Sequence, residues 1–157
     1  MKLILIVLLL FTTLNISSET NQLNQIQKDI LIYEHFNNQL KCMSENIIFE
    51  AGNQSIRGKI AVAQVTLNRV ESHKFGSSLC EVIYQPKQYS WTNKKKPKYS
   101  IMEYKEAYVI AINVIAHEVS LPELKDALFY HATYTNPCWR HKMTRVAQIE
   151  QHIFYKM

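Results

Sequence analysis

The sequence predicts a mainly helical α+β protein: a helical body with a small antiparallel β-sheet in the C-terminal third. Apolar residues recur with helical spacing from residue 25 to the proline at 122. After residue 126 they form short aromatic and apolar runs that are typical of strands. The 157 residues include 47% hydrophobic residues, three glycines and four prolines, which fits one globular domain and argues against a collagen-like, disordered or polytopic membrane protein.

The N-terminus has the pattern of a secretory signal peptide. Lys2 precedes an unbroken apolar run over residues 3–11, and small polar residues follow up to Ser18. The run is shorter than the roughly 20 apolar residues that span a bilayer. We expect residues 1–18 to direct export and to be cleaved near Ser18, with an uncleaved membrane anchor as the alternative. Residues 19–38 then form an N-terminal tether or helix, and residues 39–157 the main domain.

The first predicted helix of the main domain places a carboxyl group on its apolar face. It covers residues 25–51, with a break expected near Asn37 and Asn38, and Gly52-Asn53 is expected to end it in the left-handed conformation. Residues spaced three, four and three apart share one helix face, and here they are Leu40, Met43, Ile47 and Glu50.

Capping patterns and prolines define the elements that follow. Ser55, Ser78 and Ser100 are each placed to begin a helix, and the last two have a Glu three residues later, as in a capping box. Residues 85–100 are expected to be a loop with a basic cluster at Lys94, Lys95, Lys96 and Lys98. Residues 127–131 are predicted to be a strand, and residues 144–149 and 152–155 a hairpin.

Export implies an oxidising compartment, where the three cysteines can pair in three ways. We favour Cys42–Cys80, because both lie on predicted helices, whereas Cys138 lies in a predicted loop. Three buried free thiols are the alternative.

Glu50 is the first candidate for chemistry. An ionised, unpaired carboxylate on an apolar helix face is costly, so burial raises its pKa and favours the neutral acid. A neutral acid beside a cleft can protonate a glycosidic oxygen. The structural alternatives are a salt bridge to Arg57 or Arg69, or an exposed position at the helix end.

Several separated blocks resemble one known family, the SleB-type cell wall hydrolases, which are named after a spore cortex-lytic enzyme. The blocks occur in the family's order over about residues 40–155, and they are IFEA at 48–51, GKIAVAQVTLNRV at 58–70, CEVIYQ at 80–85, QYSW at 88–91, FYHA at 129–132, PCW at 137–139 and HIFY at 152–155.

The resemblance implies a lysozyme-like catalytic domain over residues 39–157 that cleaves the MurNAc–GlcNAc backbone of peptidoglycan, as a lytic transglycosylase with Glu50 as its single catalytic acid. It implies no cofactor or metal. The aligned polar and aromatic residues are expected to bind the glycan, and they are Gln88, Tyr89, Ser90, Trp91, Tyr130, His131 and Trp139. The family commonly has Glu-Ala-Arg-Gly-Glu where this chain has Gln54 in place of the second Glu.

Other functions stay open. A family member can bind the wall without cleaving it, although the retained Glu50 argues against this. A zinc amidase or peptidase could use His131, His141 and His152 with Cys138, but their spacing matches no common zinc pattern; a Cys/His peptidase also lacks a family pattern. The net charge of +5 favours polyanionic partners, yet no nucleic-acid-binding signature accompanies it. We therefore expect a monomer that acts on glycan strands, with no nucleic-acid partner, and with membrane contact only through an uncleaved N-terminus.

Overall fold

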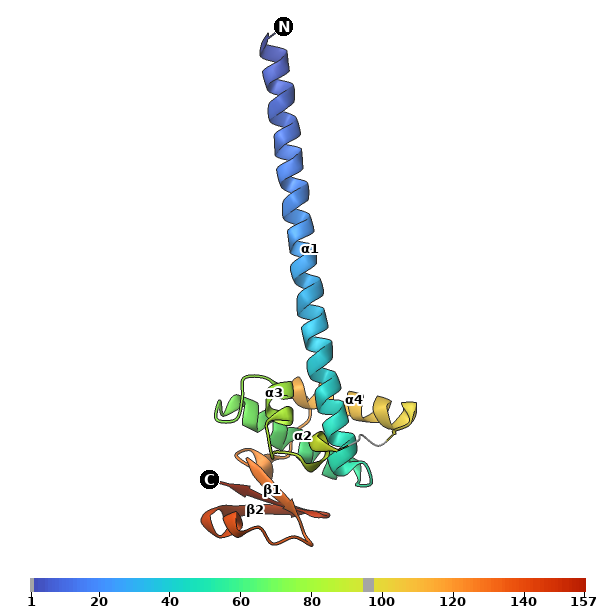
Figure 1. The fold of residues 1–157 in the computed structure, drawn as a ribbon, viewed down its shortest axis with the longest axis vertical. Helices are drawn as coiled ribbons and strands as arrows, with labels where there is room; N and C mark the ends of the chain where they lie inside the picture. Colours follow the sequence, from blue (N-terminus) through green and yellow to red (C-terminus); the bar gives the residue numbers. More distant parts are fainter. Residues whose placement is uncertain (1, 95–97) are drawn as a thin grey trace. The chain divides into compact units, whose positions relative to one another are not determined.

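The computed structural model describes the backbone of residues 2–94 and 98–157 and the side chains of residues 19–94 and 98–157. The side chains of the predicted signal peptide, and residues 95–97 of the predicted basic loop, lie outside the described part. The chain divides into two compact units, Met1–Asn37 and Asn38–Met157 (Figure 1). The second unit contains both hydrophobic cores and the sheet.

Helix α1 (Lys2–Ala51) is continuous, so the predicted break near Asn37 and Asn38 is wrong. The two asparagines cost a helix only a few tenths of a kcal/mol each, and tertiary contacts offset this. Asn38 Nδ2 lies 3.6 Å from Cys80 Sγ, so its amide bonds outward instead of competing for its own backbone. Within residues 19–94 and 98–157, no helix combines the length and the apolar character that a membrane crossing requires.

The predicted end of α1 is confirmed, but its predicted conformation is wrong. The helix ends at Ala51, and no glycine of the described chain has a positive φ. Gly52 is instead required by a close approach: a Cβ atom there would lie 2.5 Å from the carbonyl oxygen of Ile48. The chain therefore leaves α1 in a tight turn.

Three further helices begin where the serine caps predict. Ser55 and Ser78 accept hydrogen bonds from the backbone three residues later. Ser100 and Glu103 form a complete capping box. Glu81 departs from this pattern, because its carboxylate accepts from Ser77 N, at 2.8 Å, rather than from Ser78. The helices are α2 (Ile56–Glu71), α3 (Leu79–Tyr84) and α4 (Ile101–Ile115).

Helix α2 lies between the two hydrophobic cores of the second unit. Ala63 faces the core formed with α1, α3 and α4, and Ala61 and Val65 face the core formed with the sheet. Ile56, in the first turn of this helix, is 61% exposed. The fully buried residues Leu40, Met43 and Ile47 confirm the predicted apolar face of α1.

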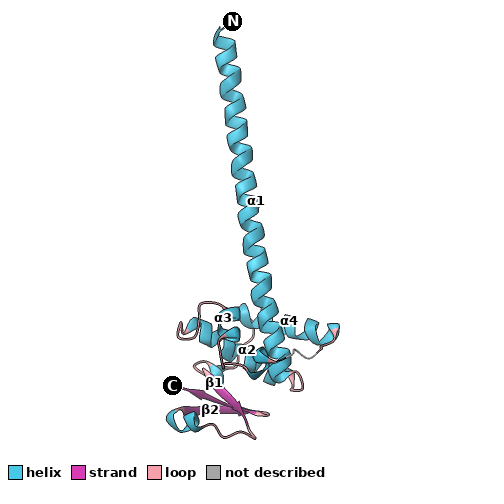
Figure 2. Cartoon of the chain, viewed as in Figure 1, coloured by secondary structure: helices cyan, strands magenta, loops and turns pink. Residues whose placement is uncertain are grey.

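The C-terminal third forms a three-stranded antiparallel sheet, as predicted, in the order β1-β3-β2 (Figure 2). The strands are β1 (Phe129–Ala132), β2 (Thr144–Ile149) and β3 (His152–Lys156). The hairpin between β2 and β3 turns without glycine, with Glu150 in the left-handed region at φ 47°. Short 3₁₀ turns occur at Ser90–Asn93, Pro122–Leu124 and Cys138–Lys142.

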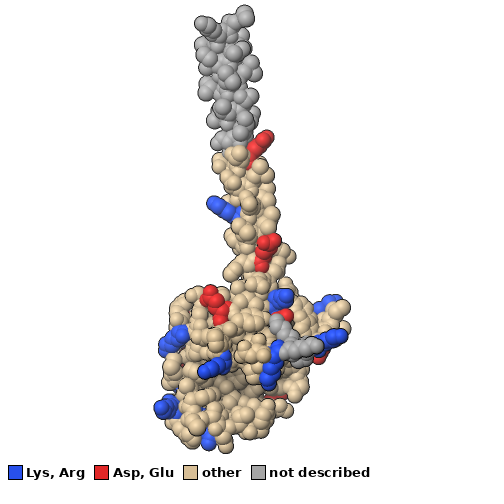
Figure 3. Space-filling view, viewed as in Figure 1, with Lys and Arg blue, Asp and Glu red and all other residues tan. Residues whose placement is uncertain are grey.

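The Cys42–Cys80 disulfide is present and joins α1 to α3, while Cys138 is free and exposed. Described Lys and Arg side chains are spread over the visible face of the second unit (Figure 3). The fold class predicted from the sequence is therefore confirmed: a helical body with a small antiparallel sheet near the C-terminus.

Candidate active site

Glu50 lies in the last turn of α1, at the end of the apolar stripe, and is half-buried. Neither predicted salt bridge forms: no ion pair joins Glu50 to a described residue, and Arg57 pairs with Glu123 instead. Glu50 receives a hydrogen bond from Tyr130 Oη, which lies 3.0 Å from Glu50 Oε2. Its other oxygen, Oε1, has no hydrogen-bond partner among the described residues.

Three influences set the protonation of Glu50. Burial raises the pKa of Glu50 above its ordinary value of 4.5, and this effect outweighs the lowering by the Tyr130 hydrogen bond and by the positive charge of Arg69. Burial likewise raises the pKa of Tyr130 well above its usual range, so its hydroxyl stays a donor at neutral pH. The result is a carboxyl group that holds its proton to higher pH than an exposed Glu.

Two cavities meet at Glu50. One, of about 400 Å³, is bordered by α1, the segment after it and the start of α4, including Tyr99 and Glu103. The other, of about 350 Å³, lies over β1 and the 3₁₀ turn at Ser90. Phe49 and Glu50 border both cavities. The carboxyl group therefore lies between two spaces, either of which can hold part of an extended ligand.

The cavity over β1 gathers most of the residues predicted to bind substrate. The predicted residues that border it are Gln88, Tyr89, Ser90, Tyr130 and His131. Ser90 is exposed and Gln88 is half-buried. Tyr89 is only 2% exposed, and its hydroxyl is bonded to Thr66 Oγ1 at 2.8 Å. Tyr89 therefore contributes its ring to the wall of the cavity rather than a free polar group.

The two predicted tryptophans border neither cavity. Trp91 is 5% exposed, and its indole N–H donates to Asn46 Oδ1 at 3.1 Å. This bond fixes the loop after residue 85 to α1. Trp139 is half-buried against His131 and Tyr155. Their predicted contact with substrate stays a prediction, and the structure shows a packing role for each.

His131 is fully occupied by internal bonds. Its Nδ1 lies 2.8 Å from the carbonyl oxygen of Ala132, and its Nε2 lies 2.9 Å from Tyr155 Oη. The carbonyl can only accept, so Nδ1 carries the proton and Nε2 accepts from the tyrosine. Because side chains alternate along a strand, His131 also lies on the sheet face opposite to Tyr130. His131 therefore stabilises the sheet, and neither of its ring nitrogens is free to transfer a proton to a ligand.

Arg69, Glu103 and His152 also border the two cavities, although none of them was predicted to bind the glycan. Arg69 is 5% exposed, donates from Nε to Leu128 O at 2.7 Å, and leaves Nη1 without a partner among the described residues. No acidic residue of the described chain pairs with it, so its charge acts on Glu50. The sequence signal for Arg69 was weak, since an Arg near a helix end is more often structural.

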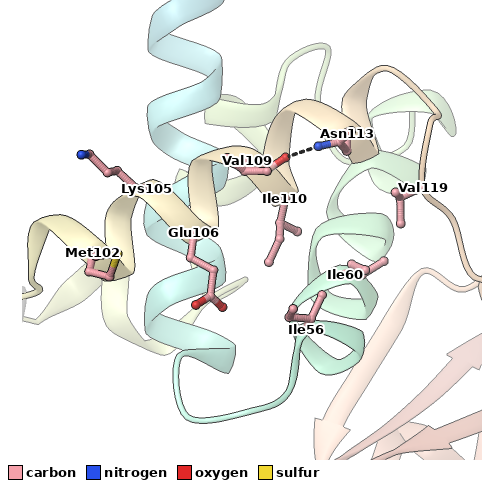
Figure 4. A pocket seen from close by; sticks show the side chains of 9 residues that line it. All are labelled: Ile56, Ile60, Met102, Lys105, Glu106, Val109, Ile110, Asn113 and Val119. Atoms are coloured by element: carbon pink, nitrogen blue, oxygen red, sulfur yellow. Dashed lines mark hydrogen bonds between the residues drawn. The ribbon is translucent and has the colours of Figure 1, made fainter.

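A third cavity, of about 520 Å³, shares no residue with the other two (Figure 4). It lies between α2 and α4, and its wall is largely apolar, including Ile56, Ile60 and Val109. Lys105 and Glu106 are its ionisable residues, and Glu106 pairs with Lys59 at 2.6 Å. Among the described residues, no cluster of three or more His, Cys, Asp or Glu could hold a metal ion. The candidate active site is at Glu50, where the two polar cavities gather most of the predicted glycan-binding residues.

The sequence matches a known class of proteins, the cell wall hydrolases. The profile of this family, described as Cell Wall Hydrolase, matches residues 53–155, and the chain belongs to the family. The matched range begins three residues after Glu50. No curated protein sequence matches the chain significantly.

Two solved structures are similar to this chain. One is the catalytic domain of the Bacillus cereus SleB protein, with 25% identity and a TM-score of 0.62, covering 76% of this chain and 91% of that one. The other is the catalytic domain of a germination-specific lytic transglycosylase, SleB from Bacillus anthracis, with 24% identity and a TM-score of 0.62, covering 76% of this chain and 94% of that one. The family resemblance noted in the sequence is thereby confirmed.

Proposed function

We propose that this protein degrades peptidoglycan by cleaving the MurNAc–GlcNAc bond of its glycan strands, with Glu50 as the general acid. One observation carries the proposal: a half-buried carboxyl group with a raised pKa, and with no ion pair to a described residue, borders two cavities. A glycan strand in these cavities would have one sugar on each side of Glu50 and its bridging oxygen beside the acid. Membership in the cell wall hydrolase family supports this substrate class.

In the first step, Glu50 Oε1 gives its proton to the glycosidic oxygen as the C1–O bond breaks. The leaving sugar departs as an alcohol, and positive charge develops on the anomeric carbon. The carboxylate that forms is stabilised by Tyr130, whose hydroxyl donates to Oε2, and by the positive charge of Arg69. Both groups favour the charged state of Glu50, so they assist proton transfer.

In the second step, the 6-hydroxyl of the muramic acid attacks its own anomeric carbon and gives its proton to the Glu50 carboxylate. The new C1–O6 bond closes a 1,6-anhydro ring, and Glu50 regains its proton. An internal nucleophile has a high effective concentration. This route needs only one carboxyl group, and the similar Bacillus anthracis protein is described as a lytic transglycosylase.

Hydrolysis, with Glu103 as the base that activates water, is the second candidate reaction. Its carboxylate borders the same cavity as Glu50. Hydrogen bonds from the backbone and side chain of Ser100 lower the pKa of Glu103, so it is ionised at neutral pH. An ionised carboxylate across a cavity from an acid can activate water in an inverting glycosidase. Its bond to Ser100 N, at 2.6 Å, binds Oε2 to the helix cap and favours the structural role.

We also propose that the protein works outside the cytoplasm and that residues 1–18 direct its export. The apolar run over residues 3–11 supports this. The Cys42–Cys80 disulfide supports it independently, since such bonds persist in oxidising compartments.

Mass spectrometry of muropeptides released from purified peptidoglycan tests the reaction. We expect anhydro-muramyl ends from the wild type and from Glu103→Gln, which keeps the capping geometry. Reducing ends that disappear in Glu103→Gln would establish hydrolysis instead. Released stem peptides would identify an amidase, and intact peptidoglycan with bound protein would identify a non-catalytic module; either result would contradict the proposal.

A further inference from the structure

Gln54 and His152 form a buried pair beside the candidate active site. They are 8% and 6% exposed, and Gln54 Nε2 lies 3.0 Å from His152 Nδ1. The remaining amide oxygen, Gln54 Oε1, is buried with no partner among the described residues. Leaving the amide oxygen buried and unpaired is costly. Within the described residues, the contact with His152 is the one hydrogen bond that the Gln54 side chain makes.

The pair determines where the imidazole carries its proton. The amide nitrogen can only donate, so Nδ1 of His152 accepts and Nε2 bears the hydrogen. The pKa of His152 is lowered to about 4, mainly by burial and also by His131, against the raising effect of Glu150. Tyr130 packs edge-on against the ring at 4.8 Å and stays protonated. His152 is therefore neutral at physiological pH.

His152 borders the same cavity as Glu50. In the antiparallel register His152 pairs with Ala132, and Tyr130 with Phe154, so the rings of His152 and Tyr130 lie on the same face of the sheet. Nε2 of His152 has no hydrogen-bond partner among the described residues, whereas both ring nitrogens of His131 are used. Of the two histidines, only His152 has a donor to offer a ligand.

We propose that His152 binds the substrate through its Nε2–H, which donates to an uncharged hydroxyl or amide oxygen of the sugar next to Glu50, and that Gln54 is the positioning residue that keeps the proton of the imidazole on Nε2. The inference rests on the proposed function for its ligand, a glycan strand. A neutral donor matches an uncharged acceptor, whereas a carboxylate would be better matched by an imidazolium.

The role of Gln54 can be tested without any ligand. In ¹H–¹⁵N correlation spectra between pH 6 and 8, His152 of the wild type should show the neutral form protonated on Nε2. Gln54→Glu should raise the pKa of His152, because a carboxylate beside Nδ1 favours the imidazolium. A wild-type imidazole protonated on Nδ1, or already charged at pH 7, would overturn the proposal.

The role of His152 is tested by binding in a Glu50→Gln background, which does not depend on turnover. The probes are a GlcNAc–MurNAc tetrasaccharide, which carries carboxylates, and a GlcNAc tetramer, which carries none. His152→Leu should weaken binding of both about 3- to 10-fold, the effect of losing one neutral hydrogen bond. His152→Gln retains an N–H donor and should recover most of the affinity. His141→Leu, at an exposed histidine outside both cavities, is the matched control.

The possible failures are distinguishable. Unchanged binding by His152→Leu, or a loss confined to the carboxylate-bearing probe, would overturn the inference and leave the proposed function intact. If the Glu50→Gln parent binds neither probe and the wild type cleaves no peptidoglycan, both proposals fail. Thermal unfolding of each variant confirms that a loss of binding is not a loss of fold.

Discussion

Removing the Tyr130 hydroxyl tests whether its hydrogen bond stabilises the carboxylate that forms when Glu50 gives up its proton. In Tyr130→Phe the ring remains packed against His152 and Phe154, but the 3.0 Å hydrogen bond to Glu50 Oε2 is lost. A hydrogen bond to a charged group is worth about 1.5–3 kcal/mol. If about half of the carboxylate charge has developed in the transition state, kcat/KM falls about 3- to 10-fold at the pH optimum.

The same substitution predicts the direction of a pH effect. The hydrogen bond lowers the pKa of Glu50, so its loss raises that pKa further. Because the first step needs the protonated acid, the decline of kcat/KM at high pH should move to higher pH in Tyr130→Phe. The assay is release of soluble muropeptides across a pH series. Tyr108→Phe, at a half-buried tyrosine outside both cavities, is the control. An unchanged profile, or a decline that moves to lower pH, would refute the reasoning.

Three further predictions concern stability. Glu50→Gln should unfold at a higher temperature than the wild type at pH 7 and at the same temperature below pH 4. Burial raises the pKa of Glu50, so the wild-type fold loses stability as pH rises above the ordinary value of 4.5 and this carboxyl group must ionise. Equal melting temperatures of the two proteins at both pH values would contradict this. Replacing Cys42 and Cys80 by Ala should cost about 4 kcal/mol in chemical denaturation, since the bond closes a loop of 38 residues, and a loss below about 1 kcal/mol would contradict it. Asn46→Leu removes the hydrogen bond that Asn46 accepts from the Trp91 indole and the one that it donates to Thr66 Oγ1. It should cost about 1–3 kcal/mol, whereas the exposed Asn93→Ala should cost almost nothing.

Local rules predicted most elements of the fold. The stripe that ends at Glu50, the capping box of Ser100 and Glu103, and the hairpin around Glu150 depend on residues within a few positions of one another. The predicted break in α1 failed because tertiary contacts decide it: Asn38 bonds to Cys80, 42 residues away.

The site was only partly predictable for the same reason. Glu50 was identifiable because a carboxyl group interrupts an apolar helix face. Tyr130 and the QYSW block were identified through the family resemblance. The Gln54–His152 pair joins residues 98 positions apart. Gln54 and His152 meet because the β2–β3 hairpin places His152 beside the turn that follows α1. Trp91 was expected to bind substrate, but an aromatic residue in a loop gives no sequence signal that separates packing from stacking on a sugar.

The most direct test of the account compares cleavage of purified peptidoglycan by wild type, Glu50→Gln and Glu71→Gln. Glu71 is an exposed carboxyl group outside both cavities and controls for the loss of one charge. Removing a general acid typically costs about 100-fold or more in rate. We predict that Glu50→Gln loses at least this much while Glu71→Gln retains wild-type activity. Cleavage by Glu50→Gln at the wild-type rate would contradict the central claim that Glu50 delivers the proton.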